Sequence, residues 1–267
     1  SNYASSFVLK GAILFAVWSK RPHRTTRDVD LLGYGNPDLA RLETVFREIC
    51  ITDVEDDGLR FDPTTVKAAP IREEAVYDGV RVTFLALLGT ARIPVQVDVG
   101  FGDATDPPAV LIEMPTLLAY PTPKLRGYRR EVVIAEKLHA MVDLGVSNSR
   151  MKDYYDVWYL AQHFEIDGPT LAIAFRSTFE RRRTSIPIDT PTGLTSEFSG
   201  APSKQAQWNA FVQRTRLAVD APSLAEAANV IASLVVPVFH TLTRNGSFGD
   251  TWPAGGPWKR KRTNESA

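Results

Sequence analysis

The chain has 267 residues, of which 44% are hydrophobic and 23% are charged, with a formal net charge of zero. This composition is typical of a soluble globular protein with a sizeable core. The single cysteine, Cys50, excludes an intramolecular disulfide and favours a reducing compartment, so we expect a cytoplasmic protein. No apolar run approaches the roughly 20 residues that a membrane span needs, and we therefore expect no membrane partner.

The charge is distributed unevenly. Residues 1–115 carry 12 basic and 17 acidic side chains, whereas residues 116–267 carry 19 basic and 14 acidic side chains. A basic second half favours a polyanionic partner such as RNA. The competing interpretation is an ordinary solvated surface.

Strand and helix patterns alternate in the first part of the chain. In chain order we predict a strand at residues 7–10, a helix at 11–19, a strand at 29–32, a helix from 36 to about 50, and two strands at 80–88 and 93–99. Residues 89–92 separate the last two strands and favour a hairpin. This pattern predicts an α/β (α+β) domain with a mixed sheet over residues 1–115.

Helical periodicity dominates the remainder. We predict helices at residues 129–145, 150–163, 169–183, 204–218 and 223–242. Pro115, Pro121 and Pro123 mark a linker before a mainly helical C-terminal domain, which we assign to residues 116–250. Gly, Pro, Ser and charged residues dominate the end of the chain, and this composition predicts a flexible basic tail at residues 251–267.

Two carboxylates share one face of the strand at residues 29–32. Because side chains alternate along a strand, Val29 and Leu31 point into a core, while Asp28 and Asp30 point the other way. Adjacent carboxylates repel each other unless a cation neutralises them, and a divalent cation does so well. An Asp-x-Asp pattern alone is also typical of a solvated strand edge.

A third carboxylate strengthens the metal interpretation. The odd-numbered residues from 93 to 99 are all apolar, and Asp98 is isolated on the opposite face of that strand. If this strand is a neighbour of the one bearing Asp28 and Asp30, three carboxylates can converge. Such a set fits two-metal phosphoryl-transfer chemistry with Mg²⁺ or Mn²⁺ and an NTP substrate.

Lys10 and Gly11 occupy the predicted transition from the first strand to a helix. Backbone N–H groups at such a turn can hold a phosphate, and the lysine can add a positive charge. The alternative is a plain tight turn without a ligand.

The predicted helices at 129–145 and 150–163 each carry charges of interest. Lys137 shares a face with apolar residues, so it either extends to solvent or reaches into a cleft where it can bind phosphate. Asp153 and Asp156 share a helical face, and Lys152 lies four residues before Asp156. An ordinary amphipathic helix with a solvated charged face explains the same pattern.

In this order the motifs resemble the AbiEii/AbiGii toxin family, whose members are nucleotidyltransferase-like toxins of bacterial toxin–antitoxin systems. The resemblance covers roughly residues 7 to 163. Its motifs are Leu-Lys-Gly-Ala at 9–12, Arg-Thr-Thr-Arg-Asp-Val-Asp-Leu at 24–31, Gln-Val-Asp-Val at 96–99, Ala-Glu-Lys-Leu-His-Ala at 135–140, and Ser-Arg-Met-Lys-Asp-Tyr-Tyr-Asp-Val-Trp at 149–158.

The resemblance implies a nucleotidyltransferase fold in the N-terminal domain. It implies Mg²⁺-dependent transfer of a nucleoside monophosphate from an NTP to the 3′ end of tRNA, which blocks aminoacylation and translation. It also implies a cognate antitoxin protein as a partner.

Residue by residue, the resemblance implies two sets of functional side chains. The implied catalytic set is Asp28, Asp30, Lys137 and Asp156, and the strand argument above adds Asp98 as the third metal ligand beside Asp28 and Asp30. The implied nucleotide-binding set is Lys10, Gly11, Ala12, Arg24, Thr25, Thr26, Arg27, Lys137, Lys152 and Asp153. Relatives usually have Gly-Ser at the turn, so Ala12 lacks a hydroxyl that Thr25 or Thr26 would have to replace.

Two further interpretations keep the fold and change the activity. The protein could nucleotidylate a small molecule or another protein, or it could bind an NTP without turnover. For the RNA interpretation, we expect basic side chains of the second half to follow the RNA backbone. These are Arg126, Arg129, Arg130 and the run Arg181, Arg182 and Arg183.

Overall fold

The computed structural model describes residues 2–19, 24, 26, 28–71, 79–103, 106–116, 118–215 and 221–260. The chain divides into two compact units. The first unit comprises Ser1–Asp103 and Ala109–Tyr128, and the second comprises Ala104–Pro108 and Arg129–Ala267. The boundary therefore falls after Tyr128, whereas the proline pattern placed it after residue 115.

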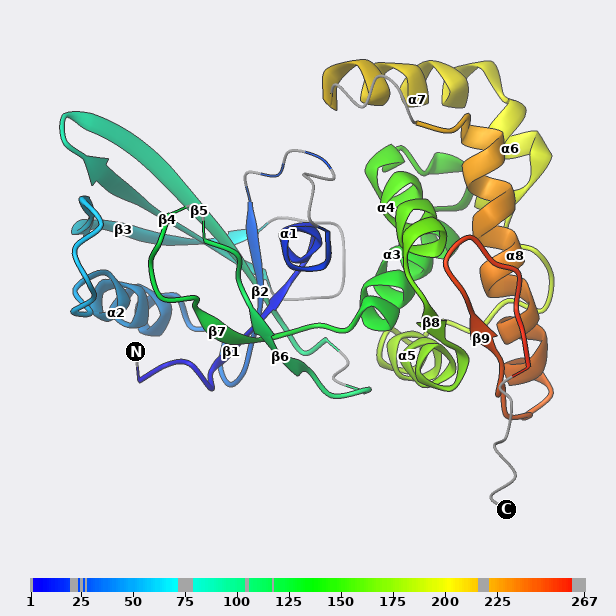
Figure 1. The fold of residues 1–267 in the computed structure, drawn as a ribbon, viewed down its shortest axis with the longest axis horizontal. Coiled ribbons are helices and arrows are strands. Elements are labelled where there is room, and N and C mark those ends of the chain that lie inside the picture. Colours follow the sequence, from blue (N-terminus) through cyan, green and yellow to red (C-terminus); the bar gives the residue numbers. More distant parts are fainter. Residues whose placement is uncertain are drawn as a thin grey trace. The chain divides into compact units, whose positions relative to one another are not determined.

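The first unit is built on a mixed seven-stranded sheet (Figure 1). Its strands are β1 (Phe7–Lys10), β2 (Val29–Gly33), β3 (Leu59–Ile71), β4 (Gly79–Leu88), β5 (Ala91–Phe101), β6 (Val110–Glu113) and β7 (Lys124–Gly127). They lie in the order β3-β4-β5-β2-β1-β7-β6. Strands β2 and β5 are parallel, as are β1 and β7, and all other neighbours are antiparallel. The predicted mixed α/β sheet is confirmed.

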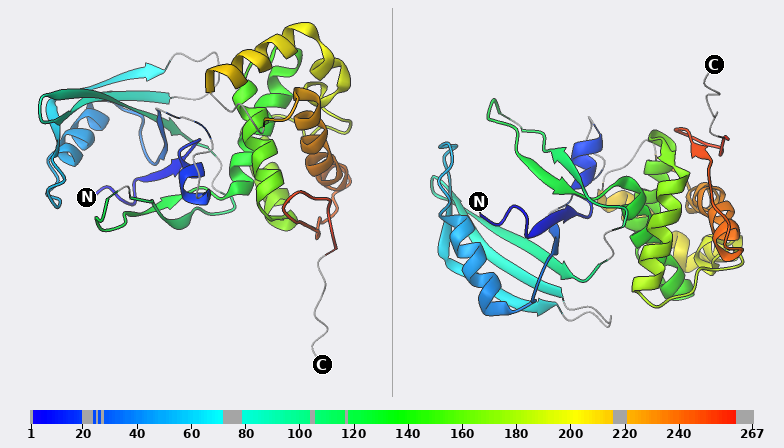
Figure 2. Two further views of the ribbon diagram at one scale, coloured as in Figure 1. Left: turned by 45° about the horizontal axis from the view of Figure 1, so that its top comes forward. Right: turned by 90° about the horizontal axis from the view of Figure 1, so that it is seen from below.

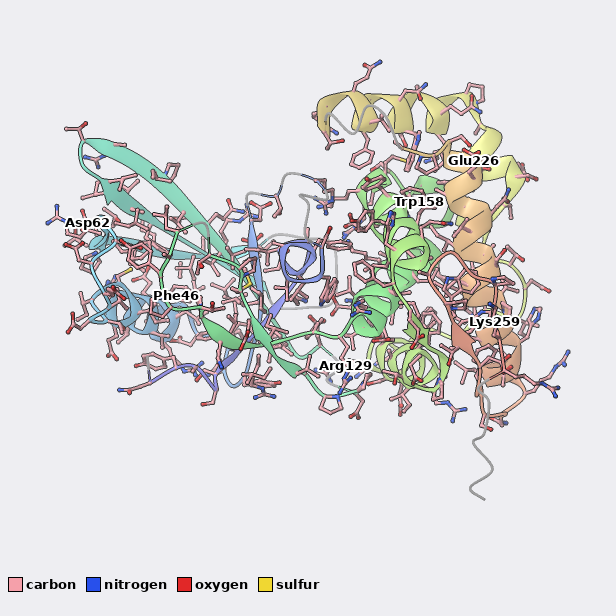
Figure 3. The ribbon with its side chains drawn as sticks, in the orientation of Figure 1. Phe46, Asp62, Arg129, Trp158, Glu226 and Lys259 are labelled. Carbon is pink, nitrogen blue, oxygen red and sulfur yellow. The ribbon has the colours of Figure 1, made fainter. Side chains whose placement is uncertain are left out.

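Helix α2 (Leu39–Cys50) packs against one face of this sheet (Figures 1 and 2). The Asp38 side chain caps its first turn by accepting from the Arg41 N–H. Its apolar stripe, which includes Phe46 (Figure 3), meets the apolar residues of β2, β4 and β5. The core on this face consists of Leu42, Val45, Phe46, Val66, Val80, Val82, Val97, Val99 and Phe101. Because strand side chains alternate, this core directs the polar residues of the same strands to the opposite face.

The sequence patterns missed three strands of the sheet. Strand β3 contains Pro63 and Pro70, which argue against a central strand, and the structure places it at the sheet edge where proline is tolerated. Strands β6 and β7 are only four residues long and flank the proline-rich stretch that resembled a linker. Helix α1 (Leu14–Trp18) begins three residues after Gly11, so it does not open directly from β1 as predicted.

The second unit is mainly helical. It contains α3 (Arg130–Leu144), α4 (Met151–His163), α5 (Gly168–Arg181), α6 (Ser196–Gly200), α7 (Pro202–Thr215) and α8 (Leu224–Thr243), with single turns of 3₁₀ helix at Gly145–Ser147 and Thr192–Leu194. Five of these helices match the predicted helices closely, and the short α6 was not predicted. The strands β8 (Ile166–Asp167) and β9 (Thr251–Trp252) form a two-stranded sheet.

Helix α8 has the predicted length but is more apolar than the sequence analysis recognised. It has 20 residues with a mean hydropathy of 1.4 over its most apolar stretch, which by length and composition would suit a membrane span. A capping box of Ser223 and Glu226 defines its start. Its apolar side chains Ile231, Leu234 and Phe239 are buried in the helical unit.

Residues 251–260 belong to the packed unit, although they were predicted to begin a flexible tail. Trp252 is 3% exposed, and its indole N–H donates to the Ala161 carbonyl over 2.8 Å. The Trp258 indole donates to the Leu234 carbonyl over 3.0 Å. These aromatic anchors outweigh the Gly- and Pro-rich composition. Residues 261–267 lie outside the described part of the chain.

Candidate functional site

Four charged residues form a row across the sheet face opposite α2. In register, Lys10 of β1 pairs with Asp30 of β2, Asp30 pairs with Asp98 of β5, and Asp98 pairs with Arg81 of β4. Directly paired residues of neighbouring strands project to the same face. The expected placement of Asp98 beside the strand that bears Asp30 is confirmed.

The side chain of Asp30 lies against the turn that follows β1. Gly11 has a φ of +73°, and a Cβ added there would overlap the Asp30 carboxylate. Glycine is therefore required at position 11 for two separate reasons, its backbone conformation and the close approach of Asp30. Asp28, two residues before Asp30, accepts a hydrogen bond from the Gln96 amide over 3.1 Å.

Lys10 has a carboxylate partner that the sequence patterns did not single out. Its ammonium pairs with Asp103, which follows the end of β5, and both side chains are largely buried. The ammonium also lies 5.9 Å from the centre of the Tyr128 ring, a cation–π distance. The lysine predicted to bind phosphate is thus held on this face by groups of the first unit.

Arg81 of the neighbouring strand β4 binds the Asp98 carboxylate. The Nε and Nη2 atoms of Arg81 donate to the two carboxylate oxygens of Asp98, each over 2.8 Å. This geometry is the planar, two-bond pairing that guanidinium forms with carboxylate or phosphate. Arg81 was missed because an arginine in an alternating strand gives no signal until the register is known.

The carboxylates do not converge as expected. Asp30 lies toward β1 and Asp98 faces β4, although the two residues are register partners. Among the described residues, no three His, Cys, Asp or Glu side chains are grouped closely enough to hold a metal ion. Repulsion between the carboxylates and the cation offered by Arg81 explain this separation. The oxygen donors themselves fit a hard divalent cation; Asp30 and Asp98 belong to one sheet face, and Asp28 directly precedes β2.

Part of the predicted nucleotide-binding segment can be placed. The Thr26 hydroxyl donates to the Asp28 carbonyl over 3.5 Å, so Thr26 contacts the backbone of the carboxylate motif. Ala12 lies in the turn between β1 and α1, and Arg24 precedes the motif. Thr25 and Arg27 lie outside the described residues.

The second unit contains a buried ionic cluster. The ammonium of Lys137 on α3 lies 2.6 Å from Asp153 and 2.8 Å from Asp156 on α4. Arg150 adds a second cation, 2.6 Å from Asp153. Both aspartates are fully buried, which contradicts a solvated charged face and the pairing of Lys152 with Asp156. Lys152 itself is exposed.

The cluster holds its members in their charged forms. Burial opposes the charge of Lys137, but Asp153 and Asp156 outweigh this cost and raise the pKa of Lys137. Burial likewise opposes ionisation of Asp153, yet Lys137 and Arg150 lower the pKa of that carboxyl. Buried charge clusters seldom add net stability compared with apolar packing, so their presence favours a functional role.

The arginines expected to follow RNA make contacts within their own units. Arg126 stacks over the Tyr34 ring at 5.7 Å. Arg129 (Figure 3) donates to the Pro108 carbonyl, and Arg130 donates to the Glu165 carbonyl. Arg181 is the last residue of α5, and Arg182 and Arg183 come directly after it. Arg182 approaches the His139 ring at 3.3 Å.

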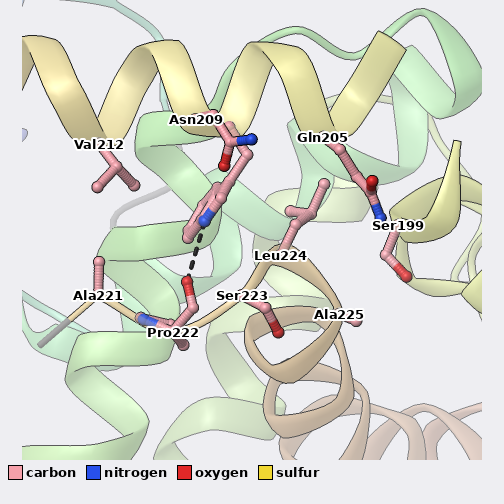
Figure 4. A pocket seen from close by; sticks show the side chains of 10 residues that line it. Ser199, Gln205, Asn209, Val212, Ala221, Pro222, Ser223, Leu224 and Ala225 are labelled. Atoms are coloured by element: carbon pink, nitrogen blue, oxygen red, sulfur yellow. Dashed lines mark hydrogen bonds between the residues drawn. The ribbon is translucent and has the colours of Figure 1, made fainter. Parts of the chain in front are cut away.

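A surface pocket of about 340 Å³ lies between α7 and the start of α8 (Figure 4). The indole N–H of Trp208 donates to the Pro222 carbonyl, and both residues line the pocket. Gln205, Asn209 and Ser223 contribute its polar lining. None of the predicted site residues lines this pocket.

The fold and the charged sheet face define a nucleotidyltransferase-like protein. Residues 1–230 match the family model described as nucleotidyl transferase AbiEii toxin of type IV toxin–antitoxin systems. Because this match spans most of the chain, the protein belongs to the AbiEii family, and it is a nucleotidyltransferase of the toxin–antitoxin class.

Two solved structures are similar to this chain. The crystal structure of JHP933 from Helicobacter pylori has a TM-score of 0.51 and 17% sequence identity, covering 91% of this chain and 88% of that one. At this identity the likeness supports the fold alone. A second H. pylori structure, assigned provisionally to the nucleotidyltransferases, has a TM-score of 0.47 and 16% identity, with 91% of each chain covered. None of the curated proteins matches the sequence.

Proposed function

We propose that this protein is a cytoplasmic toxin that transfers a nucleoside monophosphate from an NTP to RNA, with the tRNA 3′ end as acceptor. Modification of that end would block aminoacylation and translation, and a cognate antitoxin would restrain the activity. The observation that carries the proposal is the Lys10–Asp30–Asp98–Arg81 row on one sheet face of an AbiEii-family chain.

Asp28, Asp30 and Asp98 are the residues that would hold Mg²⁺ or Mn²⁺. Bound there, the cation would neutralise phosphate charge and favour ionisation of the attacking hydroxyl. Lys10 provides a positive charge beside Asp30, where it can orient a phosphate group. Gly11 allows the backbone to lie close to the Asp30 carboxylate, which leaves no room for a larger residue.

The ionic cluster of the second unit supplies the remaining proposed residues. Lys137, Asp153 and Asp156 match a family motif and carry desolvated charges that packing alone does not require. We propose Lys137 as a phosphate ligand and Asp156 as its charge partner. Lys152 and Arg24 are exposed or half-buried cations placed near these motifs in sequence, and we propose them as further nucleotide contacts.

The decisive experiment is a labelling assay with each NTP separately, total tRNA and Mg²⁺. The purified chain should label tRNA with at least one NTP, and Asp28→Asn should reduce labelling at least a hundredfold. Asp53→Asn is the matched control, because Asp53 is an exposed aspartate of the same unit outside the row. Label on a small molecule or a protein instead of tRNA would show that the acceptor is not RNA. Binding of NTP without release of pyrophosphate would contradict the proposed catalytic activity.

A further inference from the structure

The Arg81–Asp98 pair occupies the position that a third metal ligand would need. Both oxygens of the Asp98 carboxylate accept hydrogen bonds from Arg81, so the arginine takes up one acceptor position on each of them. The Asp98 side chain is 19% exposed and that of Arg81 is 44% exposed, so solvent reaches both members of the pair. The pair is therefore accessible to solvent and ions on the open sheet face.

Asp98 lies between two alternative partners. On one side β4 presents Arg81, and on the other β2 presents Asp30. A cation shared by Asp30 and Asp98 would require the Asp98 carboxylate to turn from the arginine toward its acidic neighbour. A guanidinium left next to a divalent cation would also be repelled by it.

We propose that Arg81 is a positioning residue that competes with the divalent cation for Asp98. In the ligand-free protein it keeps the third carboxylate away from Asp30 and balances its charge. When the cation binds, Asp98 exchanges partners and Arg81 is released toward solvent. Its two-bond geometry then suits a phosphate group of the NTP. This inference rests on the metal site of the proposed function.

Competition predicts that removal of the arginine tightens metal binding. We would measure Mn²⁺ binding to the full chain by electron paramagnetic resonance of free Mn²⁺, without nucleotide. Arg81→Met should bind Mn²⁺ about threefold to tenfold more tightly than the wild type, since a partly exposed ion pair is lost. Combining Arg81→Met with Asp98→Asn should return the affinity to that of Asp98→Asn alone.

The matched control is Arg92→Met. Arg92 is exposed and lies on β5, on the same strand face as Asp98 but six residues away. Arg92→Met therefore removes the same positive charge at a distance where salt screens its effect on Asp98. Its Mn²⁺ affinity should equal that of the wild type. Equal affinities of Arg81→Met and Arg92→Met would overturn the competition.

A second measurement uses the wild-type chain and does not depend on how the variant folds. The Nε–H signal of Arg81 in ¹⁵N NMR, assigned with Arg81→Lys, should move toward the position of a solvated arginine as Mg²⁺ is added. An unchanged signal at saturating Mg²⁺ would contradict the partner exchange. If the metal affinity depends on Asp28 but is the same with and without Arg81, only the competition by Arg81 is wrong. If neither the wild type nor any variant binds the metal, the proposed metal site is wrong as well.

Discussion

Asp30 and Asp98 are register partners on the parallel strands β2 and β5, yet their carboxylates are directed to opposite sides of the pair. Asp30 lies against Gly11, and Asp98 is bound by Arg81. Strand register therefore places the two aspartates side by side, and each carboxylate then contacts a different neighbour.

Gly11→Ala should impair both stability and activity. Gly11 has a φ of +73° and no space for a Cβ, whereas Gly89 has a φ of +56° and open space around it. Gly89→Ala should lower the free energy of unfolding by about 1 kcal/mol and leave nucleotide transfer unchanged. Gly11→Ala should cost about 1–3 kcal/mol more and lower transfer at least tenfold, because it displaces Asp30. Urea denaturation and the labelling assay check this, and identical behaviour of the two variants would contradict it.

Lys137→Met should destabilise the second unit strongly. It leaves Asp153 and Asp156 buried without their shared cation, which costs about 3–5 kcal/mol in the free energy of unfolding. Lys152 is an exposed lysine on α4, the helix that carries Asp153 and Asp156. Lys152→Met should change the free energy of unfolding by less than about 0.5 kcal/mol. Urea denaturation followed by circular dichroism at pH 7 measures both. A small effect of Lys137→Met would show that the cluster is not buried as described.

The same variant should change the pH dependence of stability. In the wild type the pKa of Asp153 is lower in the folded protein than in the unfolded chain. The ionised carboxylate therefore stabilises the fold fully at pH values above the unfolded-chain pKa, and this stabilisation is lost as the pH falls through the folded-state pKa. Without Lys137, only Arg150 offsets the burial that raises the pKa of Asp153, so protonation of that carboxyl relieves part of the cost. The deficit in unfolding free energy between Lys137→Met and wild type should narrow from pH 7.5 to pH 5. A deficit that widens would refute this account.

His139 should remain neutral in the folded protein well below neutral pH. Burial and the nearby Arg182 lower its pKa to about 4, and its ring contacts the Thr184 hydroxyl at 2.9 Å. Since the unfolded chain binds this proton near pH 6.5, folding stability is lost as the pH falls from 6.5 toward 4. His139→Gln should reduce that loss by up to about 1 kcal/mol between pH 7 and pH 5. An imidazole NMR signal of His139 that titrates near pH 6.5 would contradict the burial argument.

Trp252→Ala should show that residues after α8 stabilise the second unit. Trp252 is buried, donates to the Ala161 carbonyl and packs edge-on to Trp258. Its truncation should lower the free energy of unfolding by about 3–5 kcal/mol. The exposed Lys259, changed to Ala, should stay within about 0.5 kcal/mol of the wild type. Thermal unfolding by circular dichroism tests this, and equal midpoints for Trp252→Ala and the wild type would support the flexible tail predicted from the composition.

The sequence anticipated the regular elements with strong periodicity and missed those whose composition argued against them. The β4–β5 hairpin and helices α2, α3, α4, α5, α7 and α8 follow from apolar spacing. Strand β3 contains two prolines, and β6 and β7 are too short for a periodic signal. The packed segment after residue 251 is anchored by Trp252 and Trp258, whose contacts come from helices far away in sequence.

For the site, residue spacing alone determined which side chains share a face. Alternation along a strand directs Asp28, Asp30 and Asp98 away from the core regardless of what they meet, and helical spacing places Asp153 and Asp156 on one helix face, which the structure buries. Only the tertiary structure decided their partners. Arg81 and Lys137 reach the carboxylates, and Asp103 reaches Lys10, through strand register and helix packing, which depend on the whole core rather than on local spacing.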